Sequence, residues 1–465
     1  MRRALAPFLL LGLAGCSLIN GGFEECATDS QCGAGRVCLE RYCLPLPPQC
    51  RREVGGFDRA DSIRIAALLP LSEGPDGGTV DASEVAGLNA IDLAVEDVNG
   101  SGGIGNRQFS LYVCNTERQA ATIEEQTTWM VRQLGVPAII TSGSGQTRAA
   151  TDTPARADAG TFIISATATS PVLVGLFQQK GTPWRVAPSD ALQVPVMARL
   201  LTQHPDYAGS NGYAILHEDT DYGRPIASGL RERLEALGRR AEIYEYKRPI
   251  PVEGFVNSVQ GFHALDAGAT RTTVFVGFPS DIVPVVTAAR ATTLLSSASG
   301  HRWFFSDSAK DPAIVTAQTF PQVAGALGTA PAQGAGTAYQ DFRSRYRTRY
   351  QLDPNDYSFA GHSYDAAMLL MLSAAWASRE NGPITGPRMA DALLRVSAPG
   401  ATTYRLGPTT WRDASAALSQ ARSINVEGAS GALDFSPDAG APSAPYEVWQ
   451  INDGGTFTTV RTENP

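Results

Sequence analysis

The chain has 465 residues, which is too long for one typical domain and predicts two or three. Hydrophobic residues make up 43% and charged residues 18%, so the chain can bury a large core, and this composition argues against extended disorder. The formal net charge of −8 argues against a nucleic-acid partner, which would need a basic face.

The first 15 residues are predicted to be a signal peptide. Arg2 and Arg3 precede an apolar stretch, residues 4–14, which is shorter than the roughly 20 residues of a membrane-spanning helix. The sequence Leu13-Ala14-Gly15-Cys16 resembles a bacterial lipobox, and this resemblance implies that Cys16 is lipidated and anchors the protein to a membrane of the cell envelope. Whether this is the inner or the outer membrane is left open by the sequence. The alternative is an ordinary cleavage site beside an ordinary cysteine.

Six further cysteines agree with an extracytoplasmic protein. Four of them lie within residues 26–43, a segment too small to build a core, which predicts two disulfides with three possible pairings. A zinc site is the alternative, but the segment has no CxxC pair and no nearby histidine. Cys50 and Cys114 are candidates for a third disulfide, between this segment and the main body. The disulfide candidates are Cys26, Cys32, Cys38, Cys43, Cys50 and Cys114.

Strands and helices alternate from Ile63 onward. The first series predicts strands at 63–69, 109–113, 137–141 and 161–165, with helices at 86–98, 120–134 and 151–159. The second predicts strands at 213–216, 241–246, 273–276 and 302–305, with helices at 224–237 and 282–290. Such alternation is typical of parallel strands with right-handed helical crossovers. Two series predict two lobes with a cleft available between them.

Two neighbouring strands of the first series end in loops rich in hydroxyl groups, residues 141–147 and 165–170. Ligands of open parallel sheets bind beyond the carboxyl ends of the strands. Glycine backbone, a helix start and hydroxyl donors together suit a small anion such as a carboxylate. The alternative is that these residues only cap helices. A dinucleotide site is not supported, because Arg148 stands where the third glycine of that fingerprint belongs.

From Ile63 to its end, the chain carries motifs that resemble those of type I periplasmic binding proteins of the branched-chain amino acid class. They lie in order at residues 67–72, 94–104, 164–171, 185–190, 219–223, 342–366 and 428–435. The resemblance implies an α/β fold of two lobes, with parallel sheets flanked by helices and a small disulfide-rich N-terminal segment. It also implies three hinge crossings, near Pro188, near Asp307 and near Gly440. In this family, a ligand that contacts both lobes favours the closed state.

The resemblance also implies domain boundaries. The expected segments are a signal peptide at 1–15, a lipidated cysteine-rich stalk and linker at 16–60, lobe 1 at 61–187 and 307–440, lobe 2 at 188–306, and a C-terminal segment at 441–465 that returns to lobe 2.

The implied ligand-binding residues come from both lobes. The loop that holds Ser144, Gln146 and Thr147 is expected to bind a carboxylate, and the loop at 168–170 an ammonium group. Tyr222 matches the tyrosine of the second lobe that closes over the ligand. Asp307 is the candidate acid for the ammonium, with a helix N-cap as its alternative role. The full set is Ser144, Gln146, Thr147, Ala168, Thr169, Ser170, Tyr222 and Asp307.

No catalytic site, metal or cofactor is predicted, because the five histidines form no metal-ligand spacing and no GxSxG motif is present. The resemblance implies a lipid-anchored protein that captures a small polar, amino-acid-like ligand for the permease of an ABC transporter. The alternatives are a sensor that signals to another protein, and an outer-membrane lipoprotein that uses the fold as a platform for protein interaction.

Overall fold

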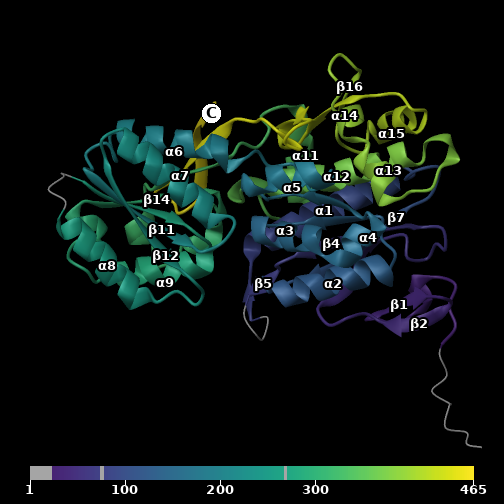
Figure 1. Ribbon diagram of the computed structural model, residues 1–465, viewed down its shortest axis with the longest axis horizontal. Coiled ribbons are helices and arrows are strands. Elements are labelled where there is room, and N and C mark those ends of the chain that lie inside the picture. Colours follow the sequence, from purple (N-terminus) through teal and green to yellow (C-terminus); the bar gives the residue numbers. More distant parts are fainter. Residues whose placement is uncertain (1–23, 74–77, 266–269) are drawn as a thin grey trace, which may run out of the picture.

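The computed structural model describes residues 24–73, 78–265 and 270–465. Two lobes lie side by side, and each is built around its own β-sheet (Figure 1). The predicted signal peptide and the predicted lipid attachment at Cys16 lie outside the described residues. Among the residues described, no helix is both long enough and apolar enough to cross a membrane.

The sheet of the first lobe has the strand order β10-β9-β8-β4-β7-β3. All its neighbouring pairs are parallel except β3 and β7. Its central strand, residues 63–69, is apolar except for Arg64, and both faces of the sheet are covered by helices, as expected for parallel strands. The strands are β3 (Cys50–Gly55), β4 (Ile63–Leu69), β7 (Phe109–Asn115), β8 (Ala138–Thr141), β9 (Phe162–Ser165) and β10 (Trp184–Arg185).

Helix α12 forms the centre of one face of this lobe. All of its residues are buried, which agrees with a sequence that is apolar around almost the whole helix. The helices of the lobe are α1 (Ala82–Gly100), α2 (Ala120–Arg132), α3 (Ser144–Asp152), α4 (Pro154–Ala159), α5 (Val172–Lys180), α11 (Thr337–Tyr350), α12 (Ala360–Ala377), α13 (Gly386–Ala390), α14 (Leu393–Val396) and α15 (Trp411–Ser419).

One predicted helix of the first lobe, at 151–159, was wrong in its bounds. The chain is already helical from Ser144 and forms α3, which ends at Asp152, and α4 then begins at Pro154. The break falls at Thr153, because a residue that precedes proline disfavours the helical conformation.

The sheet of the second lobe has the order β12-β11-β13-β14-β15-β21-β22, with its last two strands antiparallel to their neighbours. Helices α6 and α7 pack on one face, and α8 and α9 on the other. Its elements are α6 (Asp190–Gln203), β11 (Gly212–Glu218), α7 (Gly223–Ala236), β12 (Arg240–Tyr246), α8 (Val252–Ala264), β13 (Arg271–Val276), α9 (Pro279–Ala289), β14 (His301–Phe305), α10 (Phe320–Val323), β15 (Leu327–Pro331), β21 (Tyr446–Ile451) and β22 (Phe457–Glu463).

The second connection between the lobes lies later in the chain than the expected position near Asp307. Strand β15 pairs in parallel with β14, so residues 307–331 belong to the second lobe and the chain crosses after Pro331. The sequence does not predict β15 as a strand, because it contains a glycine and a proline, which are depleted in strands. Gly328 is required in it, since a Cβ there would lie 2.1 Å from the ring of Trp449.

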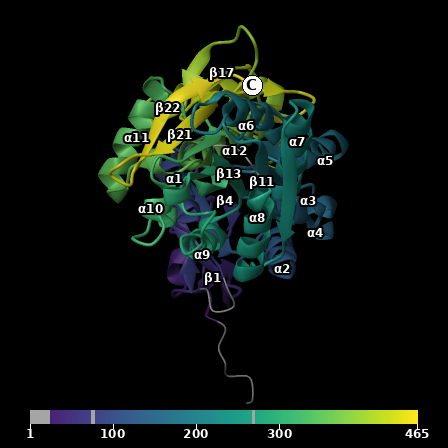
Figure 2. The same ribbon diagram turned by 90° about the vertical axis from the view of Figure 1, so that its left-hand side faces the viewer.

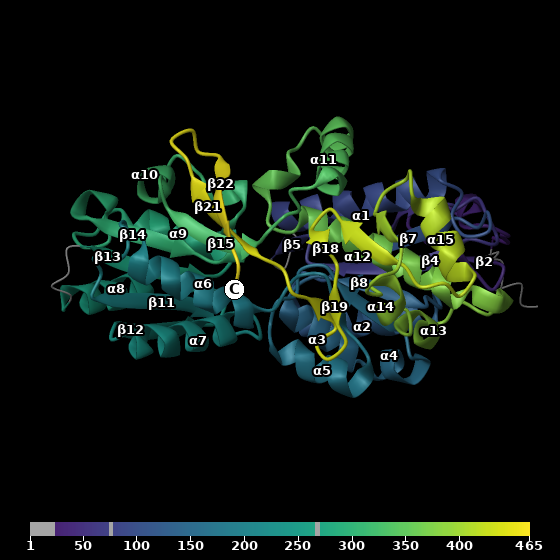
Figure 3. The same cartoon turned by 90° about the horizontal axis from the view of Figure 1, so that it is seen from above.

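The other two connections lie near their expected positions. The first follows β10 and leads into α6. The third follows β20, where the backbone N–H of Arg185 donates to the carbonyl of Gly440 at 2.8 Å. Figure 3 shows the C-terminal chain as it runs from β19 in the first lobe to β21 in the second.

The remaining elements are short. They are β1 (Arg36–Leu39), β2 (Tyr42–Pro45), β5 (Ser72–Glu73), β6 (Thr79–Val80), β16 (Thr403–Arg405), β17 (Asn425–Gly428), β18 (Gly431–Ala432), β19 (Phe435–Ser436) and β20 (Ala441–Pro442), with 3₁₀ helices at Asp29–Gln31, Ser297–Ser299, Asp307–Ala309, Pro312–Ile314, Pro354–Asp356 and Arg379–Asn381.

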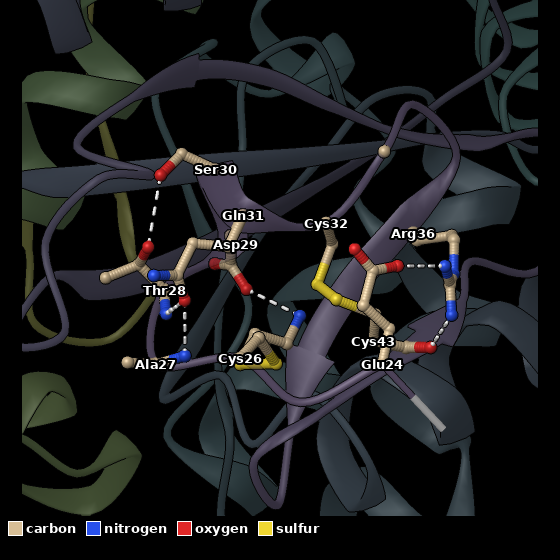
Figure 4. Close-up of a disulfide and its surroundings, with 12 residues drawn as sticks. Glu24, Cys26, Ala27, Thr28, Asp29, Ser30, Gln31, Cys32, Arg36 and Cys43 are labelled. Atoms are coloured by element: carbon tan, nitrogen blue, oxygen red, sulfur yellow. Dashed lines mark hydrogen bonds and ion pairs between the residues drawn. A yellow bond between two sulfur atoms is a disulfide. The ribbon is translucent and has the colours of Figure 1, made fainter. Parts of the chain in front are cut away.

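The N-terminal segment, residues 24–46, forms a small module around the β1–β2 hairpin. The predicted disulfides are present, as Cys26–Cys38 and Cys32–Cys43 (Figure 4). The predicted Cys50–Cys114 disulfide joins β3 to β7. Figure 2 shows the module and the β21–β22 hairpin at opposite sides of the molecule.

A buried carboxylate docks this module on the first lobe. Asp29 accepts hydrogen bonds from the backbone N–H of Cys38 at 2.9 Å, from Arg64 at 3.1 Å and from the hydroxyl of Tyr112. The Arg52 guanidinium donates to backbone carbonyls of the module, including that of Cys32 at 3.0 Å. The module is therefore a fixed part of the first lobe.

Candidate functional site

A cavity of about 60 Å³ lies between the two lobes. It is smaller than the roughly 300–1,000 Å³ of pockets for drug-sized molecules, so this closed state has room only for a small solute. The first lobe contributes Asp81, Ser83, Glu84, Arg118, Gly143, Ser144, Thr167, Ser358 and Phe359. The second lobe contributes Tyr222, Phe278, Pro279, Asp307 and Ser308.

Ser144 lies in the cavity wall because α3 begins there. Gly143 precedes it with φ +73°, a conformation that favours glycine, and its backbone N–H donates to the Thr167 hydroxyl at 2.7 Å. The Ser144 hydroxyl in turn accepts from the backbone N–H of Ser170 at 3.2 Å. The first backbone N–H groups of α3 have no hydrogen-bond partner within the helix, and they belong to the turn that begins at the cavity wall.

Gln146 and Thr147 do not line the cavity. The Thr147 hydroxyl lies 2.9 Å from that of Thr141 and donates to that of Ser165 at 3.0 Å, and Gln146 accepts from the Thr116 hydroxyl. Because α3 begins at Ser144, these two residues lie inside the helix and brace it against the strand ends. The sequence motif suggested a loop in which both would face a ligand.

The second predicted loop lies behind the cavity wall. The backbone N–H of Ala168 donates to the Ser165 hydroxyl at 3.2 Å, and the carbonyl of Ser170 accepts from Arg185 at 2.9 Å. Thr169 is buried, and its carbonyl accepts from the backbone N–H of Asp190 at 2.9 Å. Of this loop, only Thr167 lines the cavity, and it was not in the predicted set.

Tyr222 and Asp307, both in the predicted set, lie together in the second lobe, although Asp307 was expected where the chain returns to lobe 1. The Tyr222 hydroxyl donates to Asp307 Oδ1 at 2.5 Å and lies 2.9 Å from the hydroxyls of Ser306 and Ser308. Burial raises the pKa of Asp307 to about 6, while the hydrogen bond from Tyr222 favours its ionised form. Burial also raises the pKa of Tyr222 well above its usual range, and the nearby Asp307 adds to this effect.

The sequence reasoning missed the acidic residues at the start of α1. Asp81 is the N-cap and accepts from the backbone N–H of Glu84 at 3.0 Å. Glu84 accepts from the Ser142 hydroxyl at 2.6 Å. The pattern of an Asp followed three residues later by Glu is a helix-start signal, and it could have placed this end of α1 but not its position at a cleft.

Several contacts hold the lobes together around the cavity. Ser83 of the first lobe donates to Asp311 of the second from its backbone at 3.0 Å and from its hydroxyl at 2.7 Å. The Arg118 guanidinium pairs with Asp81 at 2.6 Å and lies 3.9 Å from the ring centroid of Phe278 in the other lobe. The described conformation is therefore closed.

Among the described residues, the potential metal ligands that lie close together are Cys26, Cys32 and Cys43. Each of their sulfur atoms is bonded in a disulfide, which excludes the zinc alternative.

A family model described as "Periplasmic binding protein" matches residues 62–456. No curated protein matches the chain by sequence. Among solved structures, a leucine-binding protein of Thermotoga maritima is similar, with a TM-score of 0.68 and 16% identity over 87% of this chain and 99% of that one.

Two further structures show the same fold. The LivJ substrate-binding protein of Streptococcus pneumoniae, in complex with isoleucine, has a TM-score of 0.67 and 17% identity, over 87% of this chain and 99% of that one. A solute-binding protein of an ABC transporter from R. palustris, in complex with benzoate, has a TM-score of 0.63 and 17% identity, over 87% and 97%.

Proposed function

Because the chain belongs to the type I periplasmic binding proteins, a family of solute-binding proteins rather than enzymes, we propose that it captures a small amino-acid-like zwitterion between its two lobes. We further propose that it does so as the binding component of an ABC transporter, anchored by a lipid on Cys16. The similar solved structures are described as binding leucine, isoleucine or benzoate, all small molecules with a carboxylate.

The observation that carries the proposal is the closed cavity, whose wall holds groups suited to a carboxylate and groups suited to a cation. The start of α3 at Ser144 presents backbone N–H groups and a hydroxyl, which suit a carboxylate. Asp307 of the second lobe supplies a carboxylate for a cationic group. A zwitterion that contacts both lobes binds the closed state better than the open one, which is how such a ligand shifts the population.

A ligand screen tests the proposal directly. The purified protein is heated with amino acids, amino acid amides and small carboxylic acids, and binding is then measured by isothermal titration calorimetry. We expect at least one zwitterion to raise the melting temperature. If no solute of these three classes does so, the proposed capture of a small zwitterion is wrong, and the role as a platform for protein interaction takes its place.

Asp307→Asn should lower the affinity for an amine-bearing ligand about ten- to hundredfold, because a hydrogen bond to a charged group contributes about 1.5–3 kcal/mol. The residue lines the cavity and is buried. Calorimetric titration of the best ligand from the screen measures the change. Asp158→Asn is the matched control, since its side chain is 74% exposed and lies outside the cavity. Equal affinities for the two variants would place the ammonium group elsewhere.

Binding of an amine-bearing ligand should weaken as the pH falls below about 6. Burial raises the pKa of Asp307 to about 6, so the carboxylate that attracts the cation is lost as it takes up a proton. Titrations between pH 7.5 and 5 measure this dependence. In Asp307→Asn, the affinity should vary less over the same range. An affinity that is constant in the unaltered protein would contradict the assignment.

A further inference from the structure

Direct hydrogen bonds between the two lobes form part of the cavity wall. Ser83 of the first lobe donates twice to the buried carboxylate of Asp311 in the second, from its backbone at 3.0 Å and from its hydroxyl at 2.7 Å. The hydroxyl of Ser358 in the first lobe donates to the backbone carbonyl of Asp307 in the second at 2.6 Å. Ser83, Ser358 and Asp307 all line the cavity. These contacts therefore set how far the lobes close and how much room remains between them.

The room that these contacts leave is small. The cavity measures about 60 Å³, whereas a buried cavity that admits benzene measures about 150 Å³. Leucine is larger than benzene, and only the smallest amino acids, glycine and alanine, approach the size of this cavity. A larger amino acid must either displace the wall or hold the lobes apart.

The aromatic side chains of the wall are held in place by their neighbours. The Tyr222 hydroxyl donates to Asp307 and lies within 2.9 Å of two serine hydroxyls. The ring of Phe278 has the guanidinium of Arg118 at 3.9 Å and that of Arg248 at 5.2 Å from its centroid. Because packed and paired side chains yield little, a larger ligand gains space mainly by separating the lobes.

A second hollow between the lobes, of about 320 Å³, does not extend the cavity freely. The two spaces share Asp81 and Pro279 in their walls. Ser83 lines the cavity and Asp311 lines the second hollow, so the hydrogen bonds between these two residues stand between the spaces. A ligand side chain that reached from the cavity into the second hollow would have to break this contact.

We propose that the cleft selects the smallest amino acids, glycine and alanine, and that the contact between Ser83 and Asp311 sets this limit. A ligand of that size lets the lobes close completely and form the hydrogen bonds between them. A branched amino acid such as leucine keeps the lobes apart and forgoes these bonds, so it binds more weakly. The carboxylates and hydroxyl oxygens of the wall supply acceptors for a primary ammonium. This inference rests on the proposed capture of a zwitterion and narrows it to one size class.

A size series tests the proposal on the purified protein. Glycine, alanine, valine and leucine are titrated by calorimetry, and weak binders are measured by competition with labelled glycine. We expect alanine to bind at least tenfold more tightly than leucine, because added methylene groups do not fit a cavity of this size. A smaller difference, or a preference for leucine, overturns this inference and leaves the proposed function intact. Binding of none of the four overturns this inference, and the broader ligand screen then decides on the proposed function.

The variant Asp311→Ala tests the role of the contact. It should weaken glycine binding at least fivefold, because closure no longer gains two hydrogen bonds to a carboxylate, and it should leave leucine binding unchanged. The ratio of the two affinities therefore falls at least fivefold. Equal losses for both ligands, or no loss for glycine, overturn the role of this contact. If Asp311→Ala fails to fold, Ser83→Ala takes its place, since it removes only the hydroxyl donor.

Asp353→Ala is the matched control. Asp311 and Asp353 each precede a proline and cap a 3₁₀ helix, by accepting from the backbone N–H of Ala313 at 2.7 Å and of Asn355 at 3.1 Å. Asp353 lies in the first lobe, outside the cavity and outside the contact between the lobes. The control should therefore lose the same kind of helix cap and keep both affinities. A control that loses glycine affinity as Asp311→Ala does would show that the cap, and not the contact, is the cause.

Discussion

Lys310→Met should destabilise the protein by about 3–5 kcal/mol, the usual cost of breaking a buried ion pair by removal of one partner. Lys310 Nζ lies 2.5 Å from Glu447 Oε1, and the two side chains are 0% and 3% exposed. Glu447 also accepts a hydrogen bond from the Thr459 hydroxyl at 2.6 Å. Among the described residues, no cation other than Lys310 lies within hydrogen-bond distance of the Glu447 carboxylate to compensate its charge. Urea unfolding, followed by circular dichroism, measures the loss.

Two further variants separate the buried charge from simple loss of packing. The double variant Lys310→Met, Glu447→Leu should recover most of the stability, because replacing both charges by apolar groups is often nearly neutral. Arg461→Met removes one partner of an exposed pair in the same hairpin, with Arg461 48% exposed, and should cost about 1 kcal/mol or less. A double variant as unstable as the single one would show that the charge is not the cause.

Loss of the Cys50–Cys114 disulfide should cost about 4 kcal/mol. The two cysteines are 64 residues apart, and a crosslink that closes so long a loop removes much conformational entropy from the unfolded chain. The bond also ties β3, and with it the N-terminal module, to β7. The variant Cys50→Ser, Cys114→Ser is compared with the unaltered protein in urea, both in the absence of reductant.

The variant Cys26→Ser, Cys38→Ser is the control for this bond. Its cysteines are only 12 residues apart and belong to the module, so its main effect should be local loss of the module structure. Limited proteolysis distinguishes the two, with cleavage confined to the module in the control. If the midpoint of urea unfolding is unchanged in the variant without the Cys50–Cys114 disulfide, this bond does not make the expected contribution to stability.

Much of the architecture could be predicted because it depends on local patterns. The run at 63–69 is apolar apart from Arg64, which is typical of a strand buried on both faces, and the helix that follows carries regular apolar spacing. The disulfide candidates followed from cysteine spacing, although the pairing within the module did not. Strand β15 was missed because its glycine is explained only by the ring of Trp449 from a distant strand.

The candidate site was less predictable. Ser144, Tyr222 and Asp307 line the cavity, whereas Thr147 serves to brace α3. The difference depends on where the helix begins, which moves a hydroxyl from a ligand-facing loop into the protein interior. Phe278 and Phe359 carried no local signal, because an aromatic residue in a short loop is most often part of a core.

By itself, the amino-acid sequence determined that this chain alternates strands and helices in two series, carries a crosslinked N-terminal module and belongs to one recognisable family, since these properties depend on residues close together in the chain. Only the tertiary structure decided which side chains share the cavity, where the chain crosses between lobes and which charges are buried. Those properties depend on contacts between segments as distant as Ser83 and Asp311, and no local pattern records them.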